Sequence, residues 1–257
     1  MTQAAPRSRP VAGLPIRVTN PADAARWVCE TATGRSGEAI DVHLVNAYTV
    51  AVADKDPDFR ALLRNAEANF PDGRPLAWVT SRSADPLTQV RGPDLFSNVM
   101  DQGREFGVRH FLLGTTDETL GLLRMELERR YPGVQIAGSH SPPFRALTEA
   151  EVAEQDALIR ASGAHITWVG LGTPKQDFEA QRLARVLPGM AIAVGAAFDF
   201  IAGTKKEAPA WMTKSGLEWA HRLASEPRRL WRRYLIGNAV FLRSVVSRRQ
   251  SESEQPS

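Results

Sequence analysis

Residues 165–186 read HITWVGLGTPKQDFEAQRLARV, an apolar run followed by a glycine-rich turn and then a helical pattern. The nearly continuous apolar run His165–Leu171 predicts a strand that is buried on both faces of a sheet. The segment Lys175–Val186 predicts a helix. A strand, a short turn and a helix in this order are the repeating unit of a parallel sheet covered by helices.

The same alternation extends in both directions along the chain. The predicted strands are Ala39–Val45, Arg109–Leu113, Val134–Ala137, His165–Leu171 and Met190–Ala196, and the predicted helices are Pro21–Thr31, Thr49–Ala66, Pro93–Phe106, Asp117–Arg130, Thr148–Ser162 and Lys175–Val186. Thr148 and Glu151 form a capping-box pattern, and Gly163 follows the same helix, where a left-handed residue is common. These patterns predict an α/β protein with a Rossmann-like, mostly parallel sheet and helices on both faces.

The composition is that of a globular chain, because 43% of the 257 residues are hydrophobic and 24% are charged. We expect a flexible leader over residues 1–15, an α/β core over 16–203, a helical appendage over 204–247 and a disordered tail over 248–257.

A single cysteine, Cys29, excludes a disulfide framework and a Cys-based zinc site. The uncharged run Val186–Phe198 is too short to span a bilayer, and residues 1–15 lack the apolar segment of a secretory signal. An intracellular protein without a transmembrane helix is therefore expected.

The formal net charge of +3 is distributed unevenly. Residues 204–257 contain 11 Lys and Arg against 5 Asp and Glu, whereas the other 203 residues contain 21 against 24. From Pro227 onward, apolar residues recur at helical spacing with arginines between them. This predicts one basic amphipathic helix, or two that are broken near Gly237–Asn238. Such a segment suits an anionic partner, although an ordinary helix that packs on the core gives the same pattern.

Four short motifs could carry chemistry, and each also has an ordinary structural explanation. They are Gly170–Gln176, Val194–Gly203, Phe70–Arg74 and Arg91–Asp94. Glycines after a parallel strand let the backbone approach a ligand, a carboxylate on a fixed loop can act as a base, and an arginine can bind phosphate. The structural alternatives are a simple turn, a helix N-cap carboxylate and an exposed loop arginine. The glycine turn matches neither the GxGxxG motif nor a P-loop.

No metal or cofactor site is expected from the sequence. The five histidines lack the spacing of a metal site, and no serine lies in a GxSxG motif. Asp54 and Asp56 have the spacing of a metal-binding DxD motif, but they lie within a predicted helix rather than at a strand edge.

The order of the motifs along the chain is more informative than any one of them. The blocks are Asn46 in the first strand-to-helix turn, PDG at Pro71–Gly73, RGPD at Arg91–Asp94, LGTT at Leu113–Thr116, GLGTPKQ at Gly170–Gln176, VGAAFDFIAG at Val194–Gly203, KKEAPAWM at Lys205–Met212, GLEWAHRL at Gly216–Leu223 and EPRRLWRRY at Glu226–Tyr234. With these blocks, the chain resembles the WecG/TagA/CpsF family of glycosyltransferases from about Ile40 to Phe241. The last blocks are the most specific.

The resemblance implies an inverting, metal-independent transfer from a UDP-sugar to a polyprenyl-diphosphate-linked saccharide in cell-surface polysaccharide biosynthesis. The sugar would be of the N-acetylmannosamine type or a related hexose or uronic acid. Asp72 would be the general base that takes the proton of the acceptor hydroxyl. The resemblance places these further residues at the substrates: Asn46, Gly73, Arg74, Arg91, Gly92, Gly114, Gly172, Pro174, Gln176, Gly195, Asp199 and Gly203. Among them, Gln176 and Asp199 would make polar contacts with the nucleotide.

The resemblance also gives the C-terminal segment a function. It assigns Arg222, Arg228, Arg229 and Arg232 to the diphosphate, and Trp231, Leu235, Phe241 and Leu242 to the bilayer or the prenyl chain. The protein would then act as a peripheral enzyme on the cytoplasmic face of an anionic membrane surface.

Two positions depart from the pattern of the family. Leu44 stands where many relatives have Thr, two residues before Asn46, and Asp177 stands where they usually have Glu. The first departure weakens inference about the donor sugar. The donor sugar, the acceptor, the polymer and the oligomeric state, a homo-oligomer included, stay open.

Two other functions fit the composition. A nicotinamide-dependent oxidoreductase on a Rossmann scaffold is disfavoured, because no GxGxxG and no ribose-binding acid follow the first strand. A non-enzymatic basic module that binds nucleic acid is disfavoured, because the wide apolar faces of the C-terminal helix suit lipid or protein better. No nucleic-acid partner is therefore expected.

Overall fold

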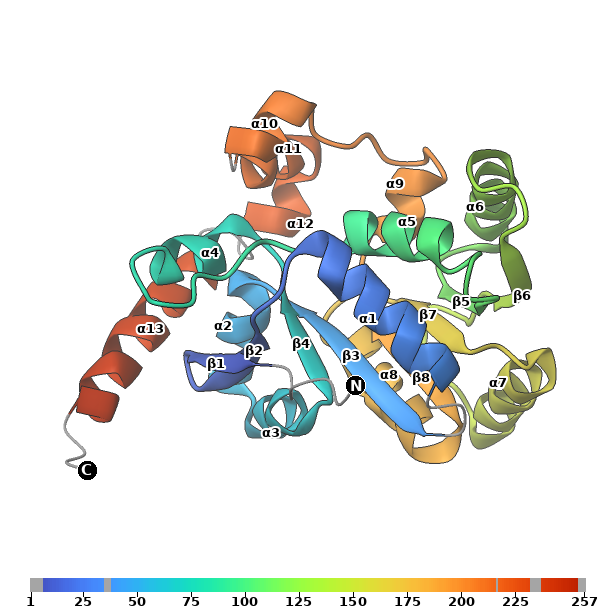
Figure 1. Cartoon of the computed structure of the whole chain (residues 1–257), viewed down its shortest axis with the longest axis horizontal. Helices are drawn as coiled ribbons and strands as arrows, with labels where there is room; N and C mark the ends of the chain where they lie inside the picture. The colour runs from blue at the N-terminus through green and yellow to red at the C-terminus, as the bar shows by residue number, and fades with distance from the viewer. Residues whose placement is uncertain (1–6, 35–37, 216, 232–236, 254–257) are drawn as a thin grey trace.

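A six-stranded parallel sheet forms the centre of the computed structural model, which describes residues 7–34, 38–215, 217–231 and 237–253 (Figure 1). Among these residues, the order across the sheet is β4 (Ala68–Pro71), β3 (Ala39–Val45), β8 (Gly189–Ala193), β7 (Ile166–Gly170), β5 (Arg109–Gly114) and β6 (Gln135–His140). Each neighbouring pair runs parallel. The predicted α/β fold is therefore confirmed.

Helices cover both faces of the sheet, with α1 in front and α8 behind in Figure 1. One face packs against α1 (Pro21–Gly34), α5 (Gly92–Gln102), α6 (Asp117–Arg130) and α9 (Ala197–Ile201), which share one hydrophobic core with the strands. The opposite face packs against α7 (Glu149–Ser162) and α8 (Lys175–Val186). Burial on both faces explains why the central strands are almost entirely apolar.

The beginning of the chain differs from the prediction. Instead of a flexible leader over residues 1–15, β1 (Ser8–Val11) and β2 (Leu14–Arg17) form an antiparallel hairpin. Ala12 and Gly13 form its turn with positive φ angles, which a two-residue hairpin turn requires. The side chains of Val11, Leu14 and Ile16 are buried, so the core begins before residue 16. Residues 1–6 lie outside the described part of the chain.

The predicted helix Thr49–Ala66 is two helices, α2 (Ala47–Lys55) and α3 (Pro57–Asn65). Asp56 accepts hydrogen bonds from two N–H groups at the start of α3, and Pro57 cannot donate one to continue α2. The sequence pattern also does not predict β4 or α4 (Arg74–Thr80). These elements are too short to show a clear periodicity.

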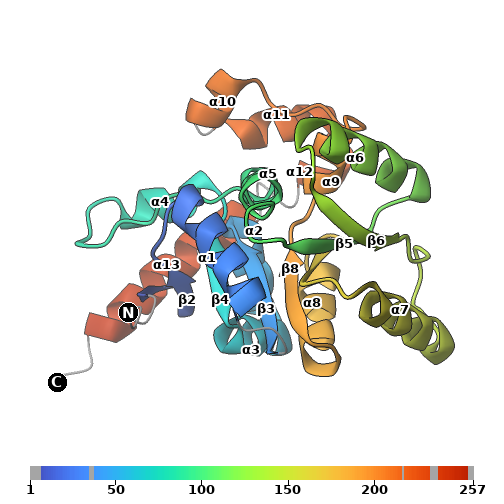
Figure 2. The same ribbon diagram turned by 45° about the vertical axis from the view of Figure 1, so that its right-hand side comes forward.

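The C-terminal segment forms four helices among the described residues: α10 (Ala210–Ser215), α11 (Glu218–Ser225), α12 (Pro227–Trp231) and α13 (Gly237–Ser253). Figures 1 and 2 both show α10, α11 and α12 gathered at one end of the molecule, close to α5 and α9. α13 lies apart from them and packs against α2. None of the helices in the described ranges has both the length and the apolar composition that crossing a membrane requires.

The packing of α13 corrects two predictions. Phe241 is only 1% exposed and lies in a hydrophobic core with residues of α2 and α3, so it does not contact lipid. The tail is not disordered from residue 248, because α13 continues to Ser253. Arg232 and Leu235, which were expected at the diphosphate and the prenyl chain, lie outside the described residues.

Candidate functional site

A cleft opens where β3, β4, β7 and β8 end, which is the usual position of a ligand site in an open parallel sheet. Its volume is about 640 Å³, including the space at its mouth. Eight of the residues predicted at the site line it: Asn46, Asp72, Arg91, Gly92, Gly172, Gln176, Gly195 and Arg222. Residues separated by up to 176 positions in the sequence are thus brought together.

Asp72 is held in the cleft by the backbone on either side of it. Its N–H donates to the carbonyl of Val45 at 2.8 Å, and the carbonyl of Pro71 accepts from Val90 N–H at 2.7 Å. Gly73 follows with a φ of 101°, a conformation that favours glycine, and begins α4. The Pro-Asp-Gly turn therefore fixes the direction of one carboxylate. Asn46 Nδ2 donates to that carboxylate at 3.2 Å.

The environment of Asp72 favours its protonated form. Burial raises the pKa of the Asp72 carboxyl, and the negative charge of Glu218 raises it further. The hydrogen bond from Asn46 and the charges of Arg222 and Arg91 act in the opposite direction but do not cancel this effect. A raised pKa makes a carboxylate a stronger base, as general-base catalysis near neutral pH requires.

Arg91 is already occupied by carboxylates. Its guanidinium donates to Asp94 at 3.1 Å, to Glu218 at 3.1 Å and to Glu207 at 2.5 Å. Its side chain is only 10% exposed. Glu207 and Glu218 come from the C-terminal segment, so this cluster joins that segment to the start of α5. The expected phosphate contact of Arg91 would need these ion pairs to open.

Gly92 allows two elements to approach closely beside this cluster. A Cβ atom at this position would lie 2.9 Å from the carbonyl oxygen of Val194 and 3.0 Å from Leu44 Cδ1. The turn after β8 is therefore packed directly on the start of α5. Leu44, which stands where many relatives have Thr, lines the cleft at the end of β3.

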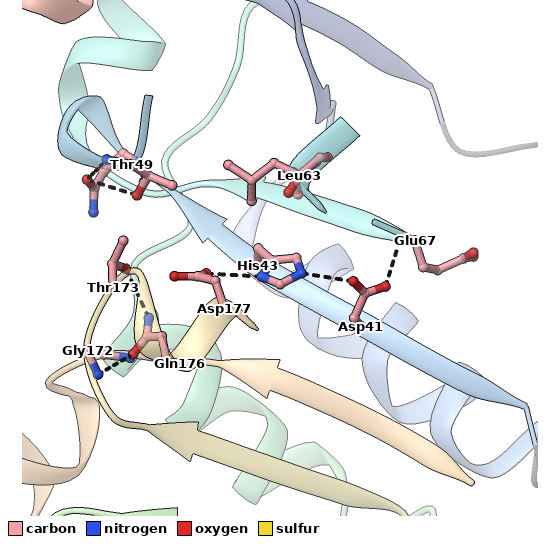
Figure 3. Close-up of polar contacts among 12 residues, drawn as sticks. Asp41, His43, Thr49, Leu63, Glu67, Gly172, Thr173, Gln176 and Asp177 are labelled. Carbon is pink, nitrogen blue, oxygen red and sulfur yellow. Dashed lines mark hydrogen bonds and ion pairs between the residues drawn. The ribbon is translucent and has the colours of Figure 1, made fainter. Parts of the chain in front are cut away.

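Gln176 joins the two glycine turns, and Figure 3 shows its side chain beside Gly172 and Thr173 of the first turn. Its Oε1 accepts hydrogen bonds from the N–H groups of Gly172 at 3.0 Å and Gly195 at 2.9 Å. The residue is 3% exposed. Both amides are thus engaged within the protein, and the two turns form a rigid wall of the cleft. The expected contact of Gln176 with a nucleotide could use only its Nε2, which lies 3.4 Å from Thr173 Oγ1.

A buried charged network lies directly behind this wall (Figure 3). His43 lies between two carboxylates, with Nδ1 3.0 Å from Asp177 and Nε2 3.1 Å from Asp41. Burial by itself lowers the pKa of His43, but the hydrogen bonds to Asp177 and Asp41 outweigh it and raise the pKa to about 9. The charged imidazole therefore ties the start of α8 to β3. Asp177 is fully buried and does not line the cleft, so its difference from the usual Glu changes this network.

The cleft contains two arginines, and Arg222 is the one that forms no ion pair with a carboxylate of the described residues. Within the described residues, its guanidinium makes no hydrogen bond or ion pair and lies over the ring of Phe200, 5.4 Å from the ring centroid. Its charge also acts on Asp72. Phe200 and Glu218 were not among the predicted site residues. Both lie inside sequence blocks that resemble the family, so those blocks were the signal that could have found them.

Several predicted residues do not line the cleft in the described structure. Asp199 forms an ion pair with Lys205 at 2.8 Å, and Gly114 packs against the backbone of Gly170. The others are Gly73, in the turn beside Asp72; Arg74, in the first turn of α4; Pro174, before α8; Gly203, after α9; and Arg228, in α12. Arg229 also belongs to α12, but its side chain lies outside the described part of the structure. Among the described residues, no group of three His, Cys, Asp or Glu side chains is arranged to hold a metal ion.

The sequence is similar to a protein-family model and to a transferase of named activity. The model of the glycosyl transferase WecG/TagA/CpsF family matches residues 9–255. An N-acetylglucosaminyldiphosphoundecaprenol N-acetyl-beta-D-mannosaminyltransferase of Bacillus spizizenii is 31% identical over 185 residues. That alignment covers 71% of this chain and 70% of the relative.

Proposed function

Since the chain belongs to the WecG/TagA/CpsF family of glycosyl transferases, we propose that it transfers an N-acetylmannosamine-type sugar from a UDP-sugar to a polyprenyl-diphosphate-linked saccharide. The resemblance found in the sequence is confirmed at the level of the family. The name of the relative supplies the acceptor of the proposal, an N-acetylglucosamine carried by a diphosphate on a polyprenol. The observation that carries the proposal is a recessed carboxylate, Asp72, in the same cleft as Arg222, an arginine that forms no ion pair with the residues that the structure describes.

The proposed reaction inverts the anomeric carbon of the donor. Asp72 takes the proton of the acceptor hydroxyl while the hydroxyl oxygen bonds to that carbon. The bond between the carbon and the phosphate oxygen breaks on the opposite face, and UDP leaves with the electron pair. Asn46, which donates to the carboxylate of Asp72, would keep one oxygen directed at the acceptor.

The leaving diphosphate gains negative charge, which the protein must stabilise. The amides of Gly172 and Gly195 are bound to Gln176, so they cannot also cradle the phosphates. Arg91 is bound to three carboxylates. Arg222 is therefore the side chain best placed to meet this charge, and the proposed reaction needs no metal ion.

The C-terminal helices would hold the enzyme at the inner face of the membrane. The side chains of Trp211, Trp231 and Leu242 are 63%, 43% and 55% exposed, and Arg228 is exposed on α12. Exposed tryptophans beside basic residues are typical of a protein that binds peripherally to an anionic bilayer surface.

The experiment that tests the function is a panel of UDP-sugars with the lipid-linked acceptor, in the presence of EDTA, with product detection by mass spectrometry. Asp72→Asn keeps the shape of the side chain but cannot accept the proton. We expect it to lower kcat by about 10²- to 10⁴-fold. Asp58→Asn, at an exposed carboxylate in the first turn of α3, is the matched control and should retain full activity. Full activity of Asp72→Asn would exclude the assigned base.

A further inference from the structure

The hydroxyl of Thr49 lies behind the cleft, in the first turn of α2. Asn46 is the N-cap of this helix, and its Oδ1 accepts hydrogen bonds from the N–H groups of Tyr48 at 3.0 Å and Thr49 at 3.1 Å. Thr49 Oγ1 also donates to this oxygen, at 3.3 Å (Figure 3). In return, the N–H of Asn46 donates to Thr49 Oγ1 at 3.3 Å. Asn46 and Thr49 therefore hold each other in a reciprocal capping box.

These contacts decide which way the amide of Asn46 faces. Two backbone N–H groups and one hydroxyl surround Oδ1. If the amide turned over, its NH2 group, which can only donate, would face the two N–H groups. Oδ1 therefore stays on the side of α2, and Nδ2 faces Asp72, whose Oδ2 accepts its hydrogen bond at 3.2 Å. The hydroxyl of Thr49 thus controls a contact of Asp72 that it does not itself make.

Thr49 is placed to act only through Asn46. Its side chain is fully buried and does not line the cleft, whereas Asn46 and Asp72 do. A threonine has two heavy atoms on Cβ, so its side chain has few conformations in the first turn of a helix. Burial and branching together give the hydroxyl a fixed position from which to hold the amide of Asn46.

The hydrogen bond from Asn46 is one of several influences on Asp72. Burial raises the pKa of the Asp72 carboxyl, and the charge of Glu218 on α11 raises it further. The bond from Asn46 lowers this pKa, as do the charges of Arg222 on α11 and Arg91 before α5. Loss of the Asn46 bond alone would leave those three charges in place. It would therefore raise the pKa of Asp72 and loosen the carboxylate.

We propose that Thr49 is a positioning residue for the proposed reaction, because its hydroxyl holds the amide of Asn46 against Asp72 and thereby fixes the direction of the carboxylate. The role of Asp72 as the base rests on the proposed function. The arrangement of the three side chains does not, so the two can be tested separately.

Thr49→Val is the discriminating variant, because it keeps the branched shape of the side chain and removes only the hydroxyl. Thr49→Ser retains the hydroxyl and should restore the behaviour of the wild type. The matched control is Thr33→Val, which removes a hydroxyl that donates to the carbonyl of Cys29 at 2.9 Å in α1 and does not line the cleft. Circular dichroism and thermal unfolding verify the fold of each variant. If the valine prevents folding, Thr49→Ala removes the same hydroxyl.

The first measurement is the pKa of Asp72 in the protein alone. It is obtained by NMR titration of ¹³C-labelled aspartate carboxyl carbons, and the resonance of Asp72 is identified by its absence in Asp72→Asn. We expect Thr49→Val to raise this pKa by about half a pH unit to one pH unit, while Thr49→Ser and Thr33→Val keep the value of the wild type. An unchanged pKa in Thr49→Val, or an equal rise in Thr49→Ser, would overturn the positioning role.

The second measurement is the pH profile of kcat/KM with the UDP-sugar and the lipid-linked acceptor. The acidic limb of Thr49→Val should move to higher pH by the same amount as the pKa of Asp72. On the plateau, kcat should fall roughly 3- to 10-fold, and KM for the UDP-sugar should stay within about twofold, since Thr49 does not line the cleft. A rise of KM in place of the fall in kcat would overturn the positioning role. A change in the pKa of Asp72 that the acidic limb does not follow would instead refute Asp72 as the base, and the positioning of its carboxylate by Thr49 would stand.

Discussion

Replacing Phe241 by alanine distinguishes a helix that belongs to the core from one that contacts lipid. Phe241 is 1% exposed and lies with residues of α2 and α3 in one hydrophobic core. Truncation of a fully buried Phe typically lowers the free energy of unfolding by about 3–5 kcal/mol. For a chain of this size, each kcal/mol shifts Tm by about 2–4 °C, so a fall of roughly 6–20 °C is expected.

Leu242 provides a control on the same helix. It is the next residue, yet 55% of its side chain is exposed. Leu242→Ala should change the free energy of unfolding by no more than about 0.5 kcal/mol. The assay is guanidinium denaturation followed by circular dichroism, with vesicle sedimentation in parallel. Leu242→Ala is expected to weaken vesicle binding without loss of stability.

Two results would refute this reasoning about α13. The first is a free energy of unfolding of Phe241→Ala within about 1 kcal/mol of that of the wild type, because removing a buried ring should lower it by more than this. The second is an equal loss of stability in both variants, because that would mean that the two faces of α13 are equally buried.

Three further predictions concern the wall of the cleft and its charges. Gln176→Leu leaves two amides without an acceptor, so the free energy of unfolding should fall by about 1–3 kcal/mol for each amide; denaturant titration measures this, and KM for the UDP-sugar should rise. The pKa of His43 is raised to about 9, above its unfolded value, so its stabilisation is complete below pH 6.5 and is lost as the pH rises through 9. Wild-type stability should therefore fall over this range by about 3 kcal/mol, whereas His43→Gln should show a flatter profile. Glu218 raises the pKa of Asp72, so Glu218→Gln should move the acidic limb of the pH profile of kcat/KM to lower pH, and an unmoved limb would contradict the coupling.

Much of the fold was readable from the sequence because it depends on local patterns. Apolar runs alternate with helical periods, and a parallel sheet with helices on both faces is the ordinary way to bury such runs. The break before Pro57 was missed, although Asp56 followed by proline is a recognised helix start. The hairpin over residues 8–17 and the strand β4 were missed as well, because short elements have too few residues to show a period.

The site was only partly predictable. The resemblance to the family assigned both Asp72 and Asn46 to the substrates, and the structure brings the two into one cleft. The pairing of Arg91 with Glu207 and Glu218 spans more than a hundred residues, and no local pattern contains it.

The sequence by itself therefore determined the architecture and the family, which depend on local spacing and on motifs, and through the family resemblance it indicated Asp72 as a candidate base. Only the tertiary structure decided which charged groups are free. Arg91 and Arg222 look equally available in the sequence, but three carboxylates surround the first and none binds the second in the described chain. Likewise, Phe241 and Leu242 are neighbours on α13, but the first is buried in the core and the second is exposed to solvent. Their exposure differs only because α13 packs on α2. Electrostatic pairing and burial depend on distances in space, and a sequence does not state these distances.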